Sequence, residues 1–277
     1  MLVTMKEILA LCEKEGKAVG MFNATGLDSV QAIIEAAEEM NEPVILGHAE
    51  VHNVYNDIDF VAPLMIGAAR HAKVPVAVHL DHGTSKEMVY RALRLGFTSI
   101  MIDASALPYE ENLALTKELT DIAHAMGVSV EAELGRIVPP GGEHAPEDFY
   151  TDPLEAKDFA RRTGIDALAI AFGTAHGFYR SAPKLDFDVV KKCHEATGLP
   201  LVMHGGSGVS PEGFTSAIES GIRKINYYSY MSQAGYMAAK KEIEEGNSHY
   251  LHDVEFKARL AMKEDVKKAI AVFTKKR

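Results

Sequence analysis

Short apolar runs recur along the whole chain and alternate with segments of helical periodicity. The runs have the continuous hydrophobicity of parallel strands that are buried on both faces. Between them, apolar residues recur at intervals of three and four, and many of these segments end in a glycine suited to a helix C-terminus. The pattern therefore predicts strands alternating with helices. The eight predicted strands are residues 18–24, 42–49, 74–82, 98–105, 128–135, 166–177, 199–208 and 222–229.

The number of these units favours a closed barrel over an open sheet. Eight strand and helix units in about 250 residues are typical of a (β/α)8 TIM barrel. An open doubly wound sheet usually has a Gly-rich dinucleotide turn after its first strand, and the chain contains no GxGxxG. No Pro/Ser-rich linker or low-complexity segment divides the sequence. We expect an α/β fold with a single domain, residues 1–277, whose last helical stretch (253–273) caps or extends the barrel.

Composition and charge exclude several classes of protein. The 277 residues are 47% hydrophobic and 25% charged, which is a globular composition. A net charge of -10 with scattered Lys and Arg predicts no contact with nucleic acid or an anionic membrane. No apolar segment approaches the roughly 20 residues of a membrane span, and residues 1–16 indicate an amphipathic helix rather than a signal peptide. Cys12 and Cys193 suit a reducing compartment, so we expect a cytoplasmic protein.

Polar residues gather where a TIM barrel has its chemistry, at the C-terminal ends of the strands. A lone histidine at such a position is more often a hydrogen-bonded structural residue than a ligand. Three histidines and three carboxylates directed at one rim instead predict a metal site. The strand-end candidates are Asn23, His48, Asp81, His82, Asp103, Glu131, Glu133, His176, His204, Asn226 and Ser229.

The ligand types indicate zinc. Three neutral imidazoles with a fourth position left open describe a catalytic zinc site, in which the ion acts as a Lewis acid. His82, His176 and His204 are the candidate ligands. His79 lies on the same side of its strand as Asp81 and could be a fourth ligand, an outer hydrogen-bonding residue or a packed barrel residue. We favour the last two interpretations.

The carboxylates Asp103, Glu131 and Glu133 are too many for one tetrahedral zinc ion. Some of them are therefore expected to orient histidines or to hold an alternative metal position.

A phosphate site is predicted beside the third histidine. The end of the seventh apolar run contains Gly205, Gly206 and Ser207 and leads to a helix start marked by Ser210 and Pro211. Backbone N–H groups and a hydroxyl in this arrangement form an anion cradle. Asn226 and Ser229 would complete it, because phosphate sites after strands seven and eight recur in TIM barrels. A Gly-rich turn without a ligand is the alternative interpretation.

Six motifs follow one another along the chain: HLDHGTS (79–85), SIMIDAS (99–105), VSVEAELG (128–135), GTAHG (173–177), HGGSG (204–208) and KIN (224–226). Together they resemble a known family, because their order and spacing are similar to those of the class II, zinc-dependent ketose-bisphosphate aldolases, which include fructose- and tagatose-bisphosphate aldolases. The resemblance covers the whole chain, from FNA (22–24) to the C-terminal helix. It implies a carbon–carbon lyase of carbohydrate metabolism, such as glycolysis, that reversibly cleaves a phosphorylated ketose to dihydroxyacetone phosphate and an aldehyde.

The resemblance also implies roles for individual residues. His82, His176 and His204 would bind zinc, and Asp81 would be the acid/base at the hydroxyl of the carbon whose bond breaks. Asp103 and Glu133 match positions near the alternative site of the metal. A monovalent cation, Na+ or K+, often accompanies the phosphate in the family, and its members are usually dimers or tetramers. The candidate substrate- and phosphate-binding residues are Asn23, Gly177, Gly205, Gly206, Ser207, Asn226 and Ser229.

The long connection 136–153 is rich in Pro and Gly and has no helical periodicity. It is interpreted as a mobile active-site loop. In the family such a loop carries a glutamate that moves the proton on the enediolate carbon. Glu143 is the candidate here, with Glu147 as the alternate, because VPPGGEHAPED departs from the usual GGxED.

Three departures from the family pattern lie on the aldehyde side. Ala49 stands where relatives commonly have a hydroxyl, and Tyr228 stands where the fructose enzymes have an acidic residue. The segment whose arginine reaches the distal phosphate is replaced near LHDVEF (251–256). The donor chemistry is therefore expected to be retained with a changed acceptor aldehyde, one that lacks a second phosphate. Alternatively, another basic residue grips that phosphate: candidates are His252, Lys257, Arg259, Arg180 or a residue of a neighbouring subunit.

Two rival enzyme classes remain open from the sequence. A zinc hydrolase on the same barrel would need no phosphate cradle, and the HxH usual on its first strand is absent. A Schiff-base aldolase would need a buried lysine, and Lys224 is the plausible one, although we interpret it as an ordinary charged residue at a strand start. A non-catalytic role is the last alternative. The natural ketose phosphate, its C4 configuration and the oligomeric state do not follow from the sequence.

Overall fold

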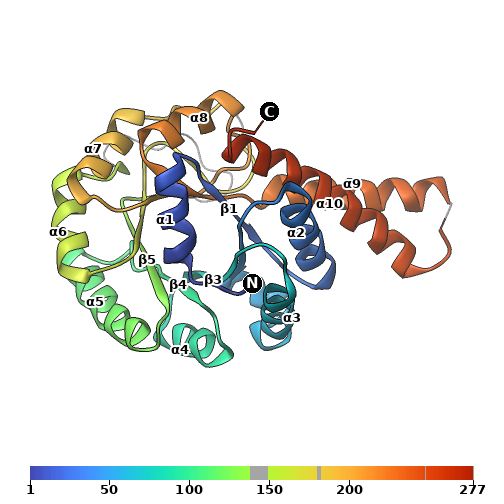
Figure 1. Cartoon of the computed structure of the whole chain (residues 1–277), viewed down its shortest axis with the longest axis horizontal. Coiled ribbons are helices and arrows are strands. Elements are labelled where there is room, and N and C mark those ends of the chain that lie inside the picture. The colour runs from blue at the N-terminus through green and yellow to red at the C-terminus, as the bar shows by residue number, and fades with distance from the viewer. Residues whose placement is uncertain (138–148, 180–181, 247, 277) are drawn as a thin grey trace.

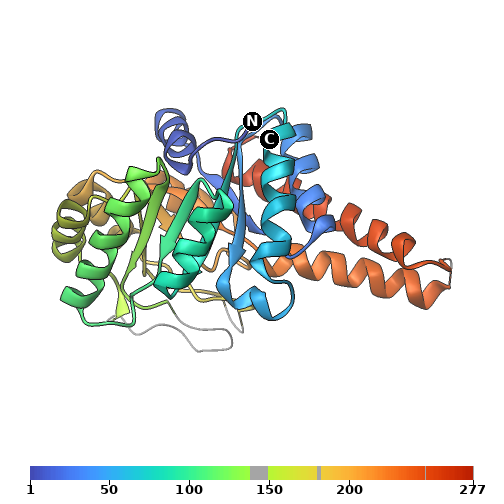
Figure 2. The same cartoon turned by 90° about the horizontal axis from the view of Figure 1, so that it is seen from below.

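The computed structural model describes residues 1–137, 149–179, 182–246 and 248–276. Eight parallel strands pair in sequence order and close into a barrel, with helices around its outside (Figures 1 and 2). The predicted (β/α)8 fold is thereby confirmed. The strands are β1 (Val19–Asn23), β2 (Val44–Ala49), β3 (Val76–Gly83), β4 (Ser99–Ile102), β5 (Ser129–Leu134), β6 (Ala167–Ile170), β7 (Leu201–Met203) and β8 (Ile222–Asn226).

Each predicted strand is present, but β6 and β7 end earlier than the apolar pattern indicated. As a result, His176 and His204 lie in the loops that follow these strands. The helices are α1 (Met5–Glu15), α2 (Leu27–Met40), α3 (Ile58–His71), α4 (Lys86–Leu95), α5 (Tyr109–Ala125), α6 (Pro153–Thr163), α7 (Phe187–Thr197), α8 (Pro211–Ser220), α9 (Ser229–Glu245) and α10 (Leu251–Phe273), with the short 3-10 helix η1 (Glu50–Val54) after β2.

The helix α1 closes the N-terminal end of the barrel. Its start is fixed by a capping box between Thr4 and Glu7. Its apolar face, including Met5 and Ile8, packs with inward-pointing strand residues in a core separate from the one between sheet and helices. The N–H of Lys6 donates to Oγ of Ser129, the first residue of β5. The opposite, C-terminal end is therefore the end that is free for ligands.

The helices α9 and α10 pack against each other and extend beyond the barrel (Figures 1 and 2). The C-terminal part of α10, including Val266 and Phe273, is buried against the barrel, as the expected C-terminal extension requires. No helix in the described part of the chain is long and apolar enough to cross a bilayer.

Candidate functional site

A cavity of about 910 Å³ opens at the C-terminal end of the barrel, where the sequence places its strand-end polar residues. The candidate zinc ligands, the acid/base and the candidate substrate residues that the structure describes line this cavity, except His204. The strand-end candidates His48 and Glu131 do not line it. The lining residues are Asn23, Ala49, Val51, His52, Asp81, His82, Asp103, Ser105, Ala106, Glu133, Arg136, Ile137, Phe149, His176, Gly177, Gly205, Gly206, Ser207, Asn226, Tyr227, Tyr228 and Ser229.

Three imidazoles meet at the floor of the cavity. One ring nitrogen from each of His82, His176 and His204 lies within 4.8 Å of the other two. Nε2 of His82 and Nδ1 of His204 face each other at 2.9 Å, close to the roughly 3.3 Å that two imidazoles sharing a tetrahedral zinc ion would have. Nε2 of His176 is buried, and no described group hydrogen-bonds to it. These three histidines fit a single metal ion.

Carboxylates contact the second ring nitrogen of two of these histidines and orient their rings. Nδ1 of His82 lies 2.7 Å from Oδ2 of Asp103, and Nε2 of His204 lies 2.9 Å from Oε1 of Glu131. Such contacts fix the orientation of a ligand ring and raise its basicity. His82, Asp103 and Glu133 also form a second group whose ligand atoms lie within 4.8 Å of one another. This group matches the alternative metal position that the sequence suggests.

An irregularity in β3 brings Asp81 and His82 to the same cavity. Successive residues of a regular strand point to opposite faces. Here the register with β4 shifts between Leu80 and Gly83, and His82 has a φ of 47°. A positive φ is uncommon for a residue with a side chain, and it re-aims the imidazole. Both side chains therefore reach the site from neighbouring positions.

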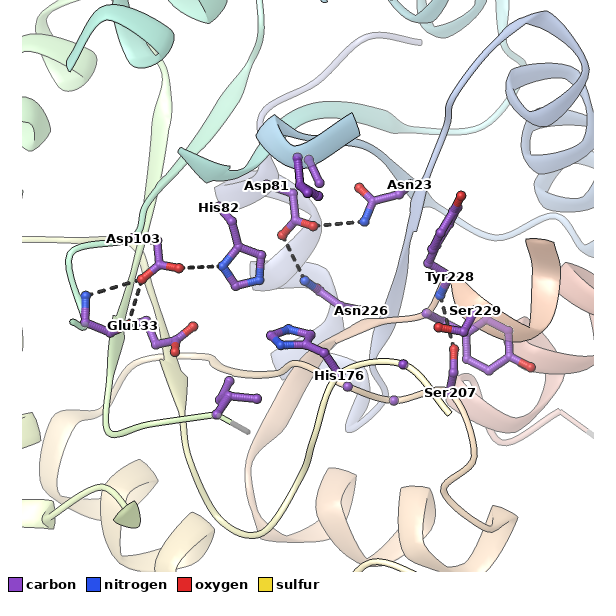
Figure 3. Close-up of a pocket in the computed structure, with 18 of the residues that line it drawn as sticks. Asn23, Asp81, His82, Asp103, Glu133, His176, Ser207, Asn226, Tyr228 and Ser229 are labelled. Carbon is purple, nitrogen blue, oxygen red and sulfur yellow. Dashed lines mark hydrogen bonds and ion pairs between the residues drawn. The ribbon is translucent and has the colours of Figure 1, made fainter. Parts of the chain in front are cut away.

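Asp81 is held as a carboxylate between two amides. Nδ2 of Asn23 donates to Oδ2 of Asp81 at 2.9 Å, and Nδ2 of Asn226 donates to its Oδ1 at 3.1 Å (Figure 3). Burial alone would raise the pKa of Asp81, but the positive charges of His82, His204 and Lys224 outweigh burial and lower it. The side chain is therefore ionised, which is the state that a proton acceptor requires.

The electrostatics of the histidine cluster favour a cation. Burial opposes protonation of His82, yet the charge of Asp81 and the bond to Asp103 raise its pKa to about 10. Burial and the neighbouring His82 lower the pKa of His176 to about 3. Burial raises the pKa of Glu133 to about 8, and the charge of Asp103 adds to the rise. The negative groups around His82 stabilise one positive charge, which a metal ion supplies as well as a proton.

Part of the loop predicted to form an anion cradle lies at the cavity. Gly177, Gly205, Ser207 and Ser229 line the cavity. At Gly205 φ is 67°, and an added Cβ would lie 2.2 Å from the carbonyl oxygen of Ala175, so only glycine fits there.

The helix N-terminus at the cavity differs from the predicted one. Ser210 and Pro211 do start α8, but they do not line the cavity, and the hydroxyl of Ser210 accepts the N–H of Gly213. The N-terminus at the cavity belongs to α9, which begins at Ser229 without a side-chain cap. A helix N-terminus stabilises bound anions, and the N-terminus placed at the cavity is that of α9 rather than that of α8. The sequence did not show this because Ser229 was assigned to the eighth strand.

Other candidate residues are buried inside the protein and bonded to neighbouring side chains. His48 is fully buried, and its Nε2 lies 2.9 Å from Oδ1 of Asn53. His79 is fully buried, with Nδ1 2.8 Å from Oγ of Ser99, as expected for a packed barrel residue. The interpretation of Lys224 as an ordinary strand-start charge is wrong, because the side chain is fully buried inside the barrel.

Several predicted or candidate residues lie away from the cavity or outside the described chain. His252, Lys257 and Arg259 are on α10 and do not line the cavity. Glu143, Glu147 and Arg180 lie outside the described residues. Sequence reasoning did not single out His52, Arg136 or Phe149, which also line the cavity. Arg136 and Phe149 belong to the connection 136–153, the predicted active-site loop, whereas nothing in the sequence context of His52 separates it from a surface residue.

A closed (β/α)8 barrel with clustered histidines, a buried carboxylate and a Gly-rich loop at its C-terminal face defines a TIM-barrel enzyme. Comparison with known proteins gives the family. The family described as "Fructose-bisphosphate aldolase class-II" matches residues 3–277. The chain belongs to this family, and it is an aldolase, a carbon–carbon lyase of a family that acts on sugar phosphates.

Individual relatives cover nearly the whole chain. A fructose-bisphosphate aldolase of Staphylococcus aureus is 42% identical over 282 residues, which are 98% of this chain and 97% of the relative. The crystal structure of the YdjI aldolase from Escherichia coli K12 superposes with a TM-score of 0.89 at 37% identity and covers 99% of this chain and 97% of that one. A putative fructose-1,6-bisphosphate aldolase from Coccidioides immitis has a TM-score of 0.86 at 32% identity, covering 97% of this chain and 95% of that one.

Proposed function

We propose that the protein is a zinc-dependent aldolase that reversibly cleaves a phosphorylated ketose to dihydroxyacetone phosphate and an aldehyde. The observation that carries the proposal is the placement of three mutually adjacent imidazoles next to the amide-bound carboxylate of Asp81. His82, His176 and His204 would hold the ion, with Asp103 and Glu133 at an alternative position. When bound, zinc supplies Lewis-acid stabilisation of the negative charge that develops during cleavage.

The residues of the chain supply the proton transfer. Asp81 accepts the proton of the C4 hydroxyl as the C3–C4 bond opens and returns it in the synthetic direction. Asn23 and Asn226 hold the carboxylate in place through their amide groups. Gly177, Gly205, Gly206, Ser207 and Ser229, with the N-terminus of α9, would bind the phosphate of the dihydroxyacetone half. A Na+ or K+ ion would accompany this phosphate.

A loop glutamate would move the proton on the enediolate carbon. Glu143 is the proposed residue and Glu147 the alternate, and both lie outside the described residues. Exchange of the C3 protons of dihydroxyacetone phosphate in D2O tests the choice, because it needs no aldehyde. Glu143→Gln should slow exchange by about 10²–10⁴-fold, the usual contribution of a general base. Glu147→Gln should leave it near wild type, and the reverse result would move the role to Glu147.

Other mechanisms receive less support. In a lysine-based aldolase the amine must be free to attack the substrate, whereas Lys224 is bonded to Glu131 and Asn226 outside the cavity lining. The zinc hydrolase alternative has lost its basis, because the whole chain matches an aldolase family. Treatment with EDTA should abolish cleavage, and zinc should restore it. Borohydride trapping of a substrate adduct on Lys224 would overturn the proposal.

The assembly and location are part of the proposal. We expect a single-domain cytoplasmic enzyme that forms a homodimer or homotetramer. Exposed apolar side chains on α9 and α10, including Tyr236, Ile243 and Phe256, support a subunit interface on these helices. Light scattering coupled to size exclusion measures the subunit number, and a monomeric mass would remove this part of the proposal.

A further inference from the structure

One side of the cavity carries buried polar atoms that the proposed proton transfer does not use. The side chain of His52 lines the cavity and is 9% exposed, and no described group hydrogen-bonds to its Nδ1. Oδ1 of Asn23, in the same cavity, also has no described partner. A buried polar atom without a hydrogen bond is costly. Both atoms are covered by protein. They would gain a partner if neighbouring side chains shifted to admit the hydroxyl groups of a ligand.

His52 and Tyr228 form one continuous surface. Their ring centroids lie 4.8 Å apart. His52 belongs to η1 after β2, and Tyr228 follows β8, so the pair bridges the rim above β1, which pairs with both strands. In Figure 3, Tyr228 and Asn23 lie on the side of His82 away from Asp103. We call these two residues, His52 and Tyr228, the β1-side wall.

The β1-side wall lies on the aldehyde side of the proposed reaction. Asp81, which acts at C4, is bonded to Asn23 at the end of β1. The backbone N–H of Tyr228 donates to Oγ of Ser207, and the next residue, Ser229, belongs to the proposed phosphate cradle. The charge of Asp81 also acts on the ring of His52. In the proposed reaction the ketose carbons beyond C4 would therefore run from Asp81 toward His52 and Tyr228.

This wall carries no positive charge to bind a second phosphate. Burial, with the charge of His48 next, lowers the pKa of His52, so its ring is neutral at pH 7. Among the lining residues that the structure describes, Arg136 is the one lysine or arginine. It follows β5, which lies across the eight-stranded barrel from β1. A neutral imidazole and a phenol suit hydroxyl groups rather than a phosphate dianion.

We infer that His52 and Tyr228 determine substrate specificity by binding the hydroxyl groups of an uncharged aldehyde, so that the enzyme prefers ketose 1-phosphates to ketose bisphosphates. This inference rests on the proposed aldolase function. It commits to one of the alternatives that the sequence leaves open, and it names the residues responsible.

The test measures aldol synthesis from dihydroxyacetone phosphate with D-glyceraldehyde or with D-glyceraldehyde 3-phosphate. The wild type should have an equal or higher kcat/KM for the uncharged aldehyde. His52→Phe keeps an aromatic ring without nitrogen and should lower this kcat/KM about tenfold or more, as expected for a lost hydrogen bond. Tyr228→Phe should act similarly. His52→Asn, whose amide reaches near the position of Nδ1, should recover part of the loss.

Proton exchange of dihydroxyacetone phosphate separates the two proposals. His52→Phe should exchange at the wild-type rate, because the proposal places the donor half on the phosphate cradle and assigns His52 to the aldehyde. Tyr55→Phe, at an exposed residue directly after η1, is the control for disturbance of that helix. Absence of exchange in the wild-type enzyme would overturn the proposed function itself. If the wild-type enzyme exchanges normally, the proposed function stands and three results would overturn the specificity assignment alone. These are a preference for the phosphorylated aldehyde, no turnover of either aldehyde, and an unchanged kcat/KM in His52→Phe.

Discussion

The ammonium group of Lys224 lies 2.9 Å from Oε2 of Glu131 inside the barrel, and neither side chain is exposed to solvent. Oε1 of Glu131 contacts His204, while Lys224 donates to Oδ1 of Asn226 at 2.8 Å. Asn226 in turn donates to Asp81. A buried ion pair thus connects a proposed metal ligand with the proposed acid/base.

Removing one member of this pair should destabilise the protein strongly. Lys224→Met leaves the charge of Glu131 buried without its partner, which costs about 3–5 kcal/mol. Urea unfolding of metal-free protein would measure the loss. The double variant Lys224→Met, Glu131→Gln should recover much of it, because no uncompensated charge remains. Additive losses in the double variant would show that the two charges do not interact.

Replacing the proposed acid/base should separate catalysis from metal binding. Asp81→Asn should lower kcat by about 10²–10⁴-fold, the usual contribution of a positioned proton acceptor. Zinc content, measured by inductively coupled plasma mass spectrometry, should stay at the wild-type level because Asp81 is not among the clustered ligand groups. Wild-type turnover in this variant would exclude the assigned role.

Replacing a histidine of the cluster should weaken zinc binding, in contrast to replacement of Asp81. His204→Ala should weaken zinc binding by more than about 100-fold, since loss of an outer hydrogen-bonding group alone costs 10–100-fold. Competition with a chromogenic chelator measures this affinity without any assay of turnover. His71→Ala, at an exposed helix position bonded to Gly67, is the matched control. Unchanged affinity in His204→Ala would remove His204 from the ligand set.

The carboxylate of Asp166 should make stability depend on pH. It accepts the N–H of Val130 and contacts His124 and Lys6. Burial would raise the pKa of Asp166, but these partners outweigh it and hold the pKa below 3.8. The stabilisation is therefore complete above the unfolded pKa and is lost as the pH falls through the folded pKa.

Asp166→Asn should accordingly lower the unfolding free energy at pH 7 by about 1–3 kcal/mol. Parallel urea titrations at pH 7 and at pH values below 4 should show the gap between variant and wild type closing in acid. If the difference in unfolding free energy between variant and wild type were the same at all pH values, the charge of Asp166 would contribute nothing to stability.

The sequence predicted the barrel well because the pattern of apolar and polar residues that specifies it repeats along the chain. Continuous apolar runs followed by helical spacing repeat eight times, and each run formed a strand. The clustering of His82, His176 and His204 was predictable for a related reason, since a closed parallel barrel brings all its strand ends to one rim.

What the sequence did not predict depends on irregular backbone and long-range contacts. The assignment of the cavity-facing helix N-terminus to α9 rather than α8 follows from where β8 ends, and the apolar residues Tyr227 and Tyr228 concealed that boundary. Burial of Lys224 depends on its pairing with Glu131, which is 93 residues distant in the chain. The packing of His52 against Tyr228 joins two loops that share no motif.

The left-handed turn at His82 has a consequence for thermal motion. In many sites, two cooperating groups come from separate strands, and their spacing changes whenever the scaffold expands or shears. Here the proton acceptor and one imidazole belong to consecutive residues, so a single rigid peptide sets the distance between their backbones. That distance consequently does not change when the barrel strands move relative to one another. Warming should weaken substrate binding before it separates Asp81 from His82.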